Sequence, residues 1–383
     1  MKVLFISHYS GLGGANLSML YLIRTLKDVS DVHPNVYIPK KGPVENLLKE
    51  FEIPYEIHHF ASLRAPQKKC IKDKMSAVVR LLVNVYLSLY LGLRNYNKYD
   101  IIYSNSSLVF FGIFLKIVMN KPLVWHLREF GEDDYNLKFS LGRKVSGWLY
   151  GKANAVISIS NIMTDYYKKN VYDCRNVKTI YNGIDDKSIR CELTKDNNPL
   201  KICIVGGISA NKNQIQVIEA IRLLRSRENV PKFNLDIIGG GDIQYINELK
   251  KIIKQSNLDN LIQFKGHKDI NWLYNNLAYY DIGIIPSKKE AFGRVTVEYM
   301  LSGVTVVASK AGANVELIDN GTTGILFRLD DVHNLADSIS ILSRDKDLRN
   351  KLSRNAYEMA KTYFTVQVNA KNVYKIFEEV INN

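Results

Sequence analysis

The stretch of residues 281–327 constrains the fold of this chain more than any other part of its sequence. It begins with a short apolar run, residues 281–286, that ends in Pro as a buried parallel strand commonly does. A polar loop leads to residues 294–302, where apolar side chains recur at helical spacing until Gly303 ends the pattern. Residues 304–308 are the next predicted strand. Strand, loop, helix and strand form a βαβ unit, which predicts an α/β fold with a ligand crevice at the carboxyl ends of parallel strands.

Two carboxylates in this unit suggest the ligand. Glu290 lies in the loop at the strand's exit and Glu298 lies about one turn into the helix, so both can face one crevice. A carboxylate accepts two hydrogen bonds and suits a vicinal diol such as a ribose, while free amides near Gly293 at the helix start suit a phosphate. Together these groups describe a sugar nucleotide. The alternative is that both acids are solvated helix-end residues, and spacing alone leaves both interpretations open.

The whole segment resembles the donor site of the retaining GT-B glycosyltransferases, glycosyltransferase family 4 or "glycosyl transferases group 1", which includes sucrose-synthase-like and bacterial polysaccharide enzymes. That family carries two Glu separated by seven residues, with Phe-Gly just after the first, and here Glu290 and Glu298 stand with Phe292 and Gly293. The positions downstream that also match are Gly303, Val306, Val307, Ala308, Glu316, Gly321 and Gly324. The resemblance implies two Rossmann-like, doubly wound domains facing a central cleft.

Length and composition agree with two domains. The chain has 383 residues, long for a single doubly wound domain, and its 46% hydrophobic and 23% charged residues are those of a globular protein. We expect an acceptor-binding domain at 1–185, a nucleotide-sugar-binding domain at 186–365, and a last helix at 366–383 that packs back on the first domain. The linker is expected at about 185–198, where polar residues replace apolar periodicity.

No targeting signal or redox chemistry is predicted. The amino terminus has no basic region before an apolar stretch, and no apolar run approaches the ~20 residues of a membrane span, so we expect a cytosolic protein. The four cysteines, which show no paired spacing and no nearby His, are Cys70, Cys174, Cys191 and Cys203. We predict reduced structural thiols, no metal site and no cofactor.

Charge is distributed unevenly. The formal net charge is +14, and residues 1–185 hold 25 Lys and Arg against 15 Asp and Glu, an excess of +10. The remainder has an excess of +4. An anionic partner for the first half is therefore predicted: a membrane face, a lipid pyrophosphate or a nucleic acid. Because no nucleic-acid motif is recognisable, we expect no nucleic acid.

Residues 64–99 are the most distinctive part of the first half. The basic residues there are Lys68, Lys69, Lys72, Lys74 and Arg80, followed by Arg94 and Lys98. Between Arg80 and Arg94 lies an uncharged run, 81–93, that contains two tyrosines. The pattern predicts either a helix in the interface of an anionic membrane or a buried domain helix with a solvated basic lead-in. The run is too short to span a bilayer.

A glycine-rich turn, residues 8–15, follows the first predicted strand and precedes a helix, an arrangement that favours phosphate. A dinucleotide-binding loop is a weaker alternative, because the third Gly of that fingerprint is missing. In the resembled family a Gly-Gly turn faces the donor phosphates, which matches Gly13 and Gly14. The acidic residue often found two positions later in the family is Asn16 here.

His126 ends the predicted strand at 121–127. A lone His there would more often be structural, but the resemblance implies that it touches the donor sugar near the reacting carbon. The loop after it carries Glu132, Asp133 and Asp134, which either grip an acceptor or are solvated.

The second domain is predicted to begin with the strand at 201–206 and a turn at Gly206. In the family an Arg beside this glycine and a Lys about five residues later bind the diphosphate. Lys212 matches, but Gly207 stands where the Arg is expected. Arg294 or a basic side chain of the other domain could compensate.

The sequence therefore predicts a retaining hexosyltransferase that moves a sugar from a nucleotide-diphosphate sugar, UDP favoured, to a glycan or lipid-linked glycan in bacterial surface polysaccharide biosynthesis. The resemblance implies that no divalent metal is needed. Glu290 would orient the sugar, and Glu298 would hold the ribose. Lys212, the amides at Gly293 and the Arg294 side chain would bind the diphosphate. A UDP-sugar epimerase of GT-B shape, or a membrane- or nucleic-acid-binding protein without enzymatic activity, are the alternatives.

Overall fold

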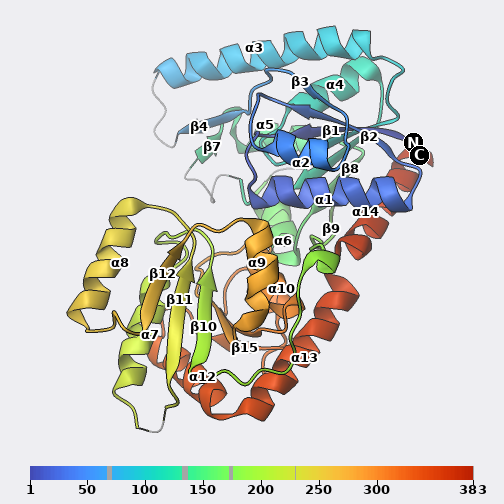
Figure 1. Ribbon diagram of the computed structural model, residues 1–383. Coiled ribbons are helices and arrows are strands. Elements are labelled where there is room, and N and C mark those ends of the chain that lie inside the picture. Colours follow the sequence, from blue (N-terminus) through green and yellow to red (C-terminus); the bar gives the residue numbers. More distant parts are fainter. Residues whose placement is uncertain (67–70, 132–136, 172–175, 229, 383) are drawn as a thin grey trace. The chain divides into compact units, whose positions relative to one another are not determined.

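The computed structural model describes residues 1–66, 71–131, 137–171, 176–228 and 230–382, with the side chains of 64–66, 71–74 and 137 outside that description (Figure 1). The chain forms two compact units. The first unit consists of Met1–Gly183 together with Val366–Asn383, and the second of Ile184–Thr365. Each unit has its own parallel sheet and its own hydrophobic core.

The sheet of the first unit has seven described strands in the order β3-β2-β1-β5-β6-β8-β9, all paired in parallel. They are β1 (Lys2–Ser7), β2 (His33–Ile38), β3 (Tyr55–Ile57), β5 (Ile101–Asn105), β6 (Leu123–Leu127), β8 (Ala155–Ser158) and β9 (Val177–Thr179). The strand order reverses between β1 and β5. Such a switch point opens a crevice at the carboxyl ends of the strands.

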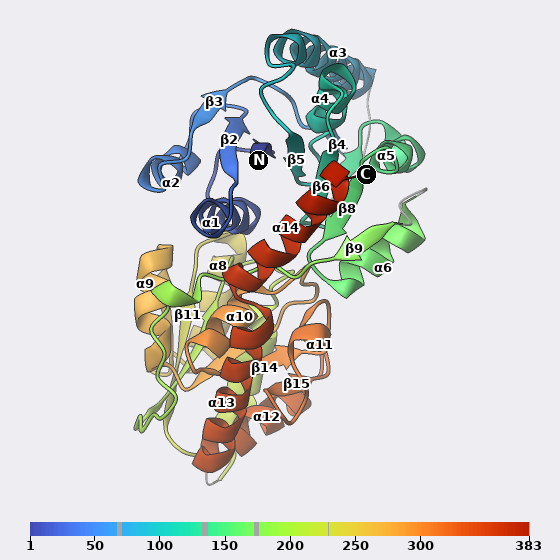
Figure 2. The ribbon, with the colours of Figure 1, turned by 90° about the vertical axis from the view of Figure 1, so that its right-hand side faces the viewer.

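Helices cover both faces of this sheet (Figure 1). They are α1 (Gly14–Val29), α2 (Val44–Glu50), α3 (Ile71–Arg94), α4 (Phe111–Met119), α5 (Gly142–Tyr150), α6 (Asn161–Asn170) and α14 (Val366–Asn382). The final helix, α14, lies beside α1 and contacts β6, so the end of the chain completes the core of the first unit (Figures 1 and 2). On the opposite face α4 covers β5 and β6, and α3 packs on α4. A short antiparallel pair joins β4 (Arg64–Pro66) to β7 (Leu137–Phe139).

The second unit repeats the design with six described strands in the order β12-β11-β10-β13-β14-β15. They are β10 (Leu200–Val205), β11 (Phe233–Ile238), β12 (Ile262–Gly266), β13 (Ile282–Ile285), β14 (Thr305–Ser309) and β15 (Ile325–Phe327). Its helices are α7 (Gln214–Arg225), α8 (Ile243–Gln255), α9 (Ile270–Asn276), α10 (Arg294–Leu301), α11 (Asn314–Leu317), α12 (Val332–Arg344) and α13 (Lys346–Tyr363). Two doubly wound parallel sheets confirm the predicted α/β, GT-B fold class.

Helix α3 corrects two expectations. Its apolar residues were predicted to be buried in the domain if they did not contact a membrane, but most of them point outward into solvent. The run 81–93 was judged too short to span a bilayer, yet the helix segment Met75–Arg94 is long and apolar enough to do so by length and composition. The expectation counted only the uncharged run, whereas the helix extends past Arg80 to Ile71 at its amino end and ends at Arg94. Lys68 and Lys69, part of the basic lead-in, lie outside the described residues.

Candidate functional site

The carboxyl end of β13 forms the predicted donor segment of the second unit. The strand ends at Ile285, a loop follows, and Gly293 precedes α10 with a φ of 90°. This left-handed conformation favours glycine, and a Cβ there would come within 3.0 Å of Thr296 Oγ1 and 3.1 Å of a Leu317 methyl group. Gly293 thus lets the chain turn sharply into the helix, whose first amides remain at the sheet edge.

Glu290 lies in this loop beside Lys212, although the two residues are 78 positions apart. The carboxylate accepts a hydrogen bond from the Lys212 ammonium, and the Glu side chain is 15% exposed against 36% for the Lys. The loop is fixed from two sides. Lys288 N–H donates to Asn211 O at 2.9 Å, and Gly312 packs on the Glu290 backbone, where a Cβ would come within 2.3 Å of Glu290 N.

Glu298 and Arg294 form a second ion pair one turn apart on α10. Arg294 Nη2 lies 3.0 Å from Glu298 Oε1, and both side chains are largely buried. The Arg also reaches the Tyr274 hydroxyl at 3.5 Å. A buried charge that is paired and hydrogen-bonded has a fixed orientation. The structure therefore brings the predicted site residues Glu290, Glu298, Lys212 and Arg294 together as two acid–base pairs flanking Gly293.

The turn after β10 is open where the family carries its Arg. Gly206 has a φ of 140°, and a Cβ built on either Gly206 or Gly207 would meet nothing within 4 Å. Gly239, directly after β11, packs closely against this turn, because a Cβ there would come within 1.9 Å of Gly206 O. A side chain at position 207 would thus have room.

Phe292 is positioned differently from the other predicted residues. Its side chain is buried, and its ring meets that of Phe364 edge to face at 6.3 Å. The ring is therefore buried against Phe364, and the backbone of Phe292 lies in the loop beside Gly293.

In the first unit, His126 is the last residue but one of β6 and is completely buried. Its Nδ1 bonds to the Tyr103 hydroxyl, and its Nε2 has no hydrogen-bond partner among the described residues. Burial, followed by the nearby Arg128 charge, lowers the pKa of His126 well below its usual value, so the ring is neutral at pH 7. Burial raises the pKa of Tyr103 to about 12, so its hydroxyl keeps its proton. With Tyr103 as the donor to Nδ1, the proton of the neutral ring is on Nε2.

Arg128 organises the polar groups around His126, and sequence reasoning did not single it out as a site residue. Its guanidinium donates to Asn105 Oδ1, to Asn182 Oδ1 at 2.5 Å and to the Tyr103 hydroxyl at 3.3 Å. Asn105 ends β5, and Asn182 lies in the loop after β9. The signal available in the sequence was position, since polar residues at the carboxyl ends of neighbouring parallel strands meet at one edge.

Glu129 was also missed. It is buried and accepts hydrogen bonds from Ser106 Oγ, from Ser107 N at 2.8 Å and from Ser107 Oγ at 2.8 Å. Burial raises the pKa of its carboxyl, although these donors and Arg128 act in the opposite direction. Glu129 lines a cavity of about 740 Å³ at the carboxyl edge of the sheet, which also includes Lys40 and Lys41.

The glycine-rich turn also lines this cavity, through Gly13 and Gly14 among others. Tyr9 lies across the turn, and a Cβ on Gly13 would come within 1.7 Å of its hydroxyl oxygen. The turn is pinned by Asn16, whose side chain donates to Tyr9 O and Gly11 O at 2.8 Å each. Asn16 is buried, so its role in the structure is to hold the loop. The acidic loop residues Glu132, Asp133 and Asp134 lie outside the described residues.

Two of the four cysteines are described, and both are free thiols. Cys203 is buried on β10, and burial raises its pKa to about 12, so it remains an unreactive protonated thiol. Burial also raises the pKa of Cys191. Cys70 and Cys174 lie outside the described residues.

Comparison with known families agrees with this geometry. The model described as "Glycosyltransferase Family 4" matches residues 12–188, and the model described as "Glycosyl transferases group 1" matches residues 185–359. The chain belongs to the GT-B glycosyltransferases of family 4. It is a glycosyltransferase of the hexosyltransferase class, EC 2.4.

Relatives and solved structures match this chain over most or all of its length. An uncharacterized glycosyltransferase of Methanocaldococcus jannaschii is 25% identical over 384 residues, 99% of this chain and 99% of the relative. The lipopolysaccharide core biosynthesis mannosyltransferase LpsB of Rhizobium meliloti is 26% identical over 62% of this chain and 70% of its own length. HepE of Anabaena, solved in complex with UDP, has a TM-score of 0.80 at 24% identity, covering 99% of this chain and 100% of HepE. The HepE likeness concerns the fold.

Proposed function

We propose that this glycosyltransferase transfers a hexose, with retention of its anomeric configuration, from a UDP-sugar to a glycan or lipid-linked glycan acceptor. The observation that carries the proposal is the pair of acid–base contacts, Lys212 with Glu290 and Arg294 with Glu298, on either side of the helix start at Gly293. The two pairs supply carboxylates for hydroxyl groups and cations for phosphates within one short segment.

UDP is the proposed nucleotide. The Glu298 carboxylate, held by Arg294, is suited to the two ribose hydroxyls, and the amides after Gly293 are suited to the diphosphate. HepE, which shares the fold along its whole length, was solved with UDP. A bidentate diol contact needs a fixed carboxylate, and the Arg294 pair fixes it without consuming both oxygens.

The leaving diphosphate is proposed to be stabilised by Lys212 without a divalent metal. A diphosphate that reaches the ammonium competes with Glu290 for it, because both are anions seeking the same donor. Exchange of partners would free the Glu290 carboxylate for the donor sugar's hydroxyls and for the positive charge that develops at the reacting carbon. The diphosphate oxygen would then take the proton of the incoming hydroxyl on the same face of the sugar, which gives retention.

His126 is proposed to contact the sugar as a neutral hydrogen-bond donor. Its Nε2–H is buried, and an unsatisfied buried donor costs about 1–3 kcal/mol, which a sugar hydroxyl accepting that bond would relieve. Arg128 and Tyr103 position the ring, since Arg128 holds Tyr103 and Tyr103 holds Nδ1. The residue thus acts by hydrogen bonding, with no change of protonation.

The acceptor is proposed to enter the cavity of about 740 Å³ in the first unit. Glu129 would accept a hydrogen bond from an acceptor hydroxyl, and Lys40 with Lys41 favours an acceptor that carries phosphate or carboxylate groups. A lipid-linked or anionic glycan has these features. We place the reaction at the cytoplasmic side of a membrane, in surface polysaccharide assembly.

A donor panel tests the proposal. The purified chain is incubated with UDP-glucose, UDP-galactose, UDP-N-acetylglucosamine and GDP-mannose, with and without EDTA, and release of nucleotide is measured. We expect slow hydrolysis of one UDP-sugar that EDTA leaves unchanged, and a product whose anomer, read by NMR, matches that of the donor. Activity with GDP-mannose alone would show that the nucleotide is GDP and not UDP. Inhibition by EDTA would overturn metal independence, and a product of inverted configuration would overturn retention.

A further inference from the structure

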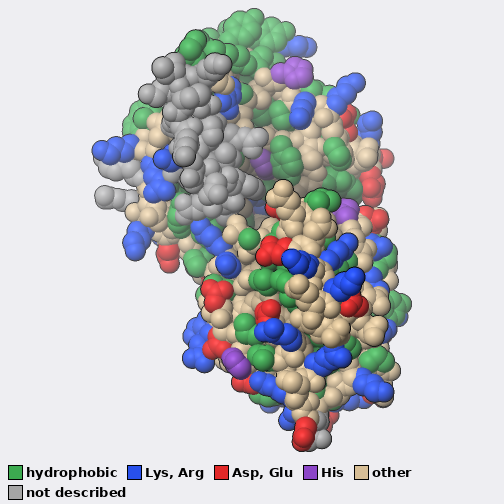
Figure 3. Space-filling model, turned by 90° about the vertical axis from the view of Figure 1, so that its left-hand side faces the viewer, with side chains coloured by type: hydrophobic (Ala, Val, Ile, Leu, Met, Phe, Trp, Pro, Cys, Tyr) green, Lys and Arg blue, Asp and Glu red, His purple; other side chains and the backbone are tan. Residues whose placement is uncertain are grey.

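The outward face of α3 is mainly apolar from Met75 to Leu93. Nine of the twenty-one large hydrophobic side chains that are exposed among the described residues lie on α3. They are Met75, Val78, Val79, Leu82, Val83, Tyr86, Leu89, Tyr90 and Leu93. Their spacing of three and four residues places them on one side of the helix. Hydrophobic side chains accordingly form the upper margin of the surface in Figure 3, at the level of α3 in Figure 1.

The inward face of α3 is polar, the reverse of an ordinary surface helix. Asn84 and Ser88 are fully buried, and the Asn84 amide exchanges hydrogen bonds with the backbone N and O of Ala61, each at 2.8 Å. Gly92 allows close approach to α4, because a Cβ there would come within 2.5 Å of a Val118 methyl group. The helix therefore docks on its own domain largely through polar and small residues together with Leu91, and leaves most of its large apolar residues outside.

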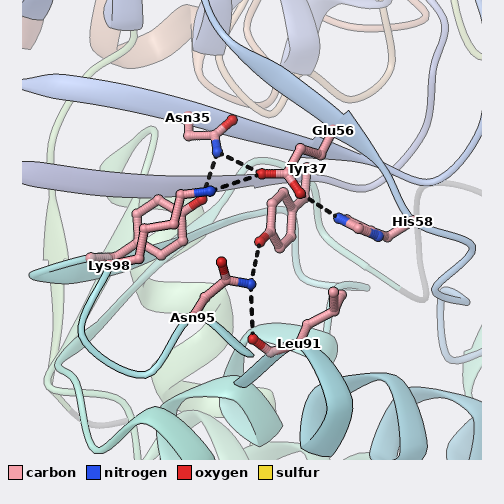
Figure 4. A network of polar contacts seen from close by, with 8 residues as sticks. Asn35, Tyr37, Glu56, His58, Leu91, Asn95 and Lys98 are labelled. Carbon is pink, nitrogen blue, oxygen red and sulfur yellow. Dashed lines mark hydrogen bonds and ion pairs between the residues drawn. The ribbon is translucent and has the colours of Figure 1, made fainter. Parts of the chain in front are cut away.

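Polar contacts also fix the carboxyl end of α3 to the sheet (Figure 4). Asn95, directly after the helix, donates to Leu91 O at 2.9 Å and to the Tyr37 hydroxyl at 3.4 Å. Lys98 pairs with Glu56 on β3 at 3.1 Å. Rolling α3 to bury its apolar face would break these contacts and those of Asn84, and a helix that left the domain to span a bilayer would lose them too. The orientation with the apolar side outward is thus built into the fold.

The positive charge around α3 indicates what kind of surface covers its outward apolar face. Residues 81–93 carry no charge, and they are bracketed by Arg80 and Arg94 in a region, 1–185, with an excess charge of +10. Two copies meeting through this face would bring like charges together, whereas an anionic bilayer attracts them. Tyr86 and Tyr90 are exposed at mid-helix, and tyrosine favours the boundary between headgroups and acyl chains.

We propose that α3 lies flat in the interface of an anionic membrane, with its outward side chains among the acyl chains and its polar side against the domain. The exposed apolar side chains run from Met75 to Leu93, so the apolar strip is about 28 Å long. Apolar burial and attraction of the basic region to anionic lipid act together. The inference uses only the surface of the first unit, so it stands or falls independently of the transfer reaction.

Vesicle flotation tests the proposal with the full chain. Vesicles of phosphatidylcholine alone and of phosphatidylcholine with phosphatidylglycerol carry neither donor nor acceptor. We expect the protein to float with the anionic vesicles and to bind neutral ones more weakly. The triple variant Leu82→Ser, Leu89→Ser, Leu93→Ser should partition roughly tenfold less or lower still, since three exposed apolar side chains are removed. Carbonate washing at alkaline pH should release the bound protein.

A matched control keeps the test specific. The triple variant Ile243→Ser, Val315→Ser, Ile341→Ser removes equally exposed apolar side chains from the second unit and should float like the unmodified protein. Circular dichroism should give the same melting curve for both triples, because none of the six side chains is buried. Arg94→Gln should weaken flotation only with anionic vesicles.

Three results would overturn the proposal. Unchanged flotation of the α3 triple variant, or no flotation of the unmodified protein, would exclude this face as a membrane contact. Resistance to carbonate would mean that the helix spans the bilayer instead of lying flat. A dimer in solution that the α3 triple variant converts to a monomer, without vesicle binding by either, would assign the face to a second copy of the chain.

Discussion

The carboxyl edge of the second sheet holds one partly exposed ion pair besides the buried Arg294–Glu298 pair, whereas the network around His126 at the first edge is buried throughout. In the second unit Lys212 and Glu290 form a partly exposed ion pair that a charged ligand can reach. In the first unit His126, Arg128 and Glu129 are buried at 5% exposure or less, and neighbouring side chains hold each of them. An exposed pair contributes little to stability and can exchange partners, whereas a buried network is rigid and costly to break. The second edge is therefore suited to charge rearrangement and the first to positioning.

The largest effect is expected from Glu290→Ala. Loss of the carboxylate that we propose to contact the sugar should reduce kcat by roughly 10³-fold or more, measured by nucleotide release, while the melting temperature changes little. Glu219→Ala, which removes a carboxylate that pairs with Arg222 on α7, is the matched control and should retain activity. An active Glu290 variant would show that the carboxyl edge of the second sheet takes no part in the transfer reaction.

Arg128→Met should destabilise the carboxyl edge of the first sheet. The change leaves Asn105 and Asn182 without their buried donor, and we expect a loss of about 3 kcal/mol of stability, seen as a lower melting temperature. Lys212→Met, which removes the cation of the exposed pair, should change stability by less than about 0.5 kcal/mol but reduce turnover. Equal melting temperatures for the two variants would contradict the contrast between the edges.

Gly207→Arg should strengthen UDP binding at the carboxyl edge of the second sheet. Position 207 has room for a side chain, and an Arg there would add a cation for the diphosphate. We expect the Kd for UDP to fall by roughly tenfold, as measured by calorimetry. Gln255→Arg, an addition of the same charge at the exposed carboxyl end of α8 in the same unit, should leave the Kd unchanged. Equal gains from both would indicate a general charge effect and not a phosphate contact.

The smallest effect concerns the pH dependence of stability. His126 has a lowered pKa in the folded state, so below pH about 6.5 the unfolded chain binds a proton that the folded chain does not. Its contribution to stability is therefore complete above that pH and is lost as the pH falls, by about 1 kcal/mol at pH 6. His126→Gln should flatten the fall in melting temperature between pH 7 and pH 6. An unchanged slope would mean that His126 is protonated while buried.

Much of the second unit's edge could be predicted from sequence, because its residues are local. Glu290, Gly293, Arg294 and Glu298 lie within nine positions, and helix periodicity sets which of them share a side. The pairing of Glu290 with Lys212 could not be predicted from spacing, since it depends on how two loops pack. Phe292 illustrates the limit: it belongs to the matching motif, yet its ring is buried against Phe364.

The sequence by itself determined the alternation of strands and helices, the two-domain α/β fold and the site segment around Gly293, because these follow from periodicity and from local conformational preferences. Only the tertiary structure decided that Arg128 and Glu129 belong to the first edge and that α3 turns its apolar side outward. The physical reason is that an amphipathic pattern states which residues share a face, whereas contacts such as Asn84 with Ala61 and Gly92 with α4 decide which face is buried.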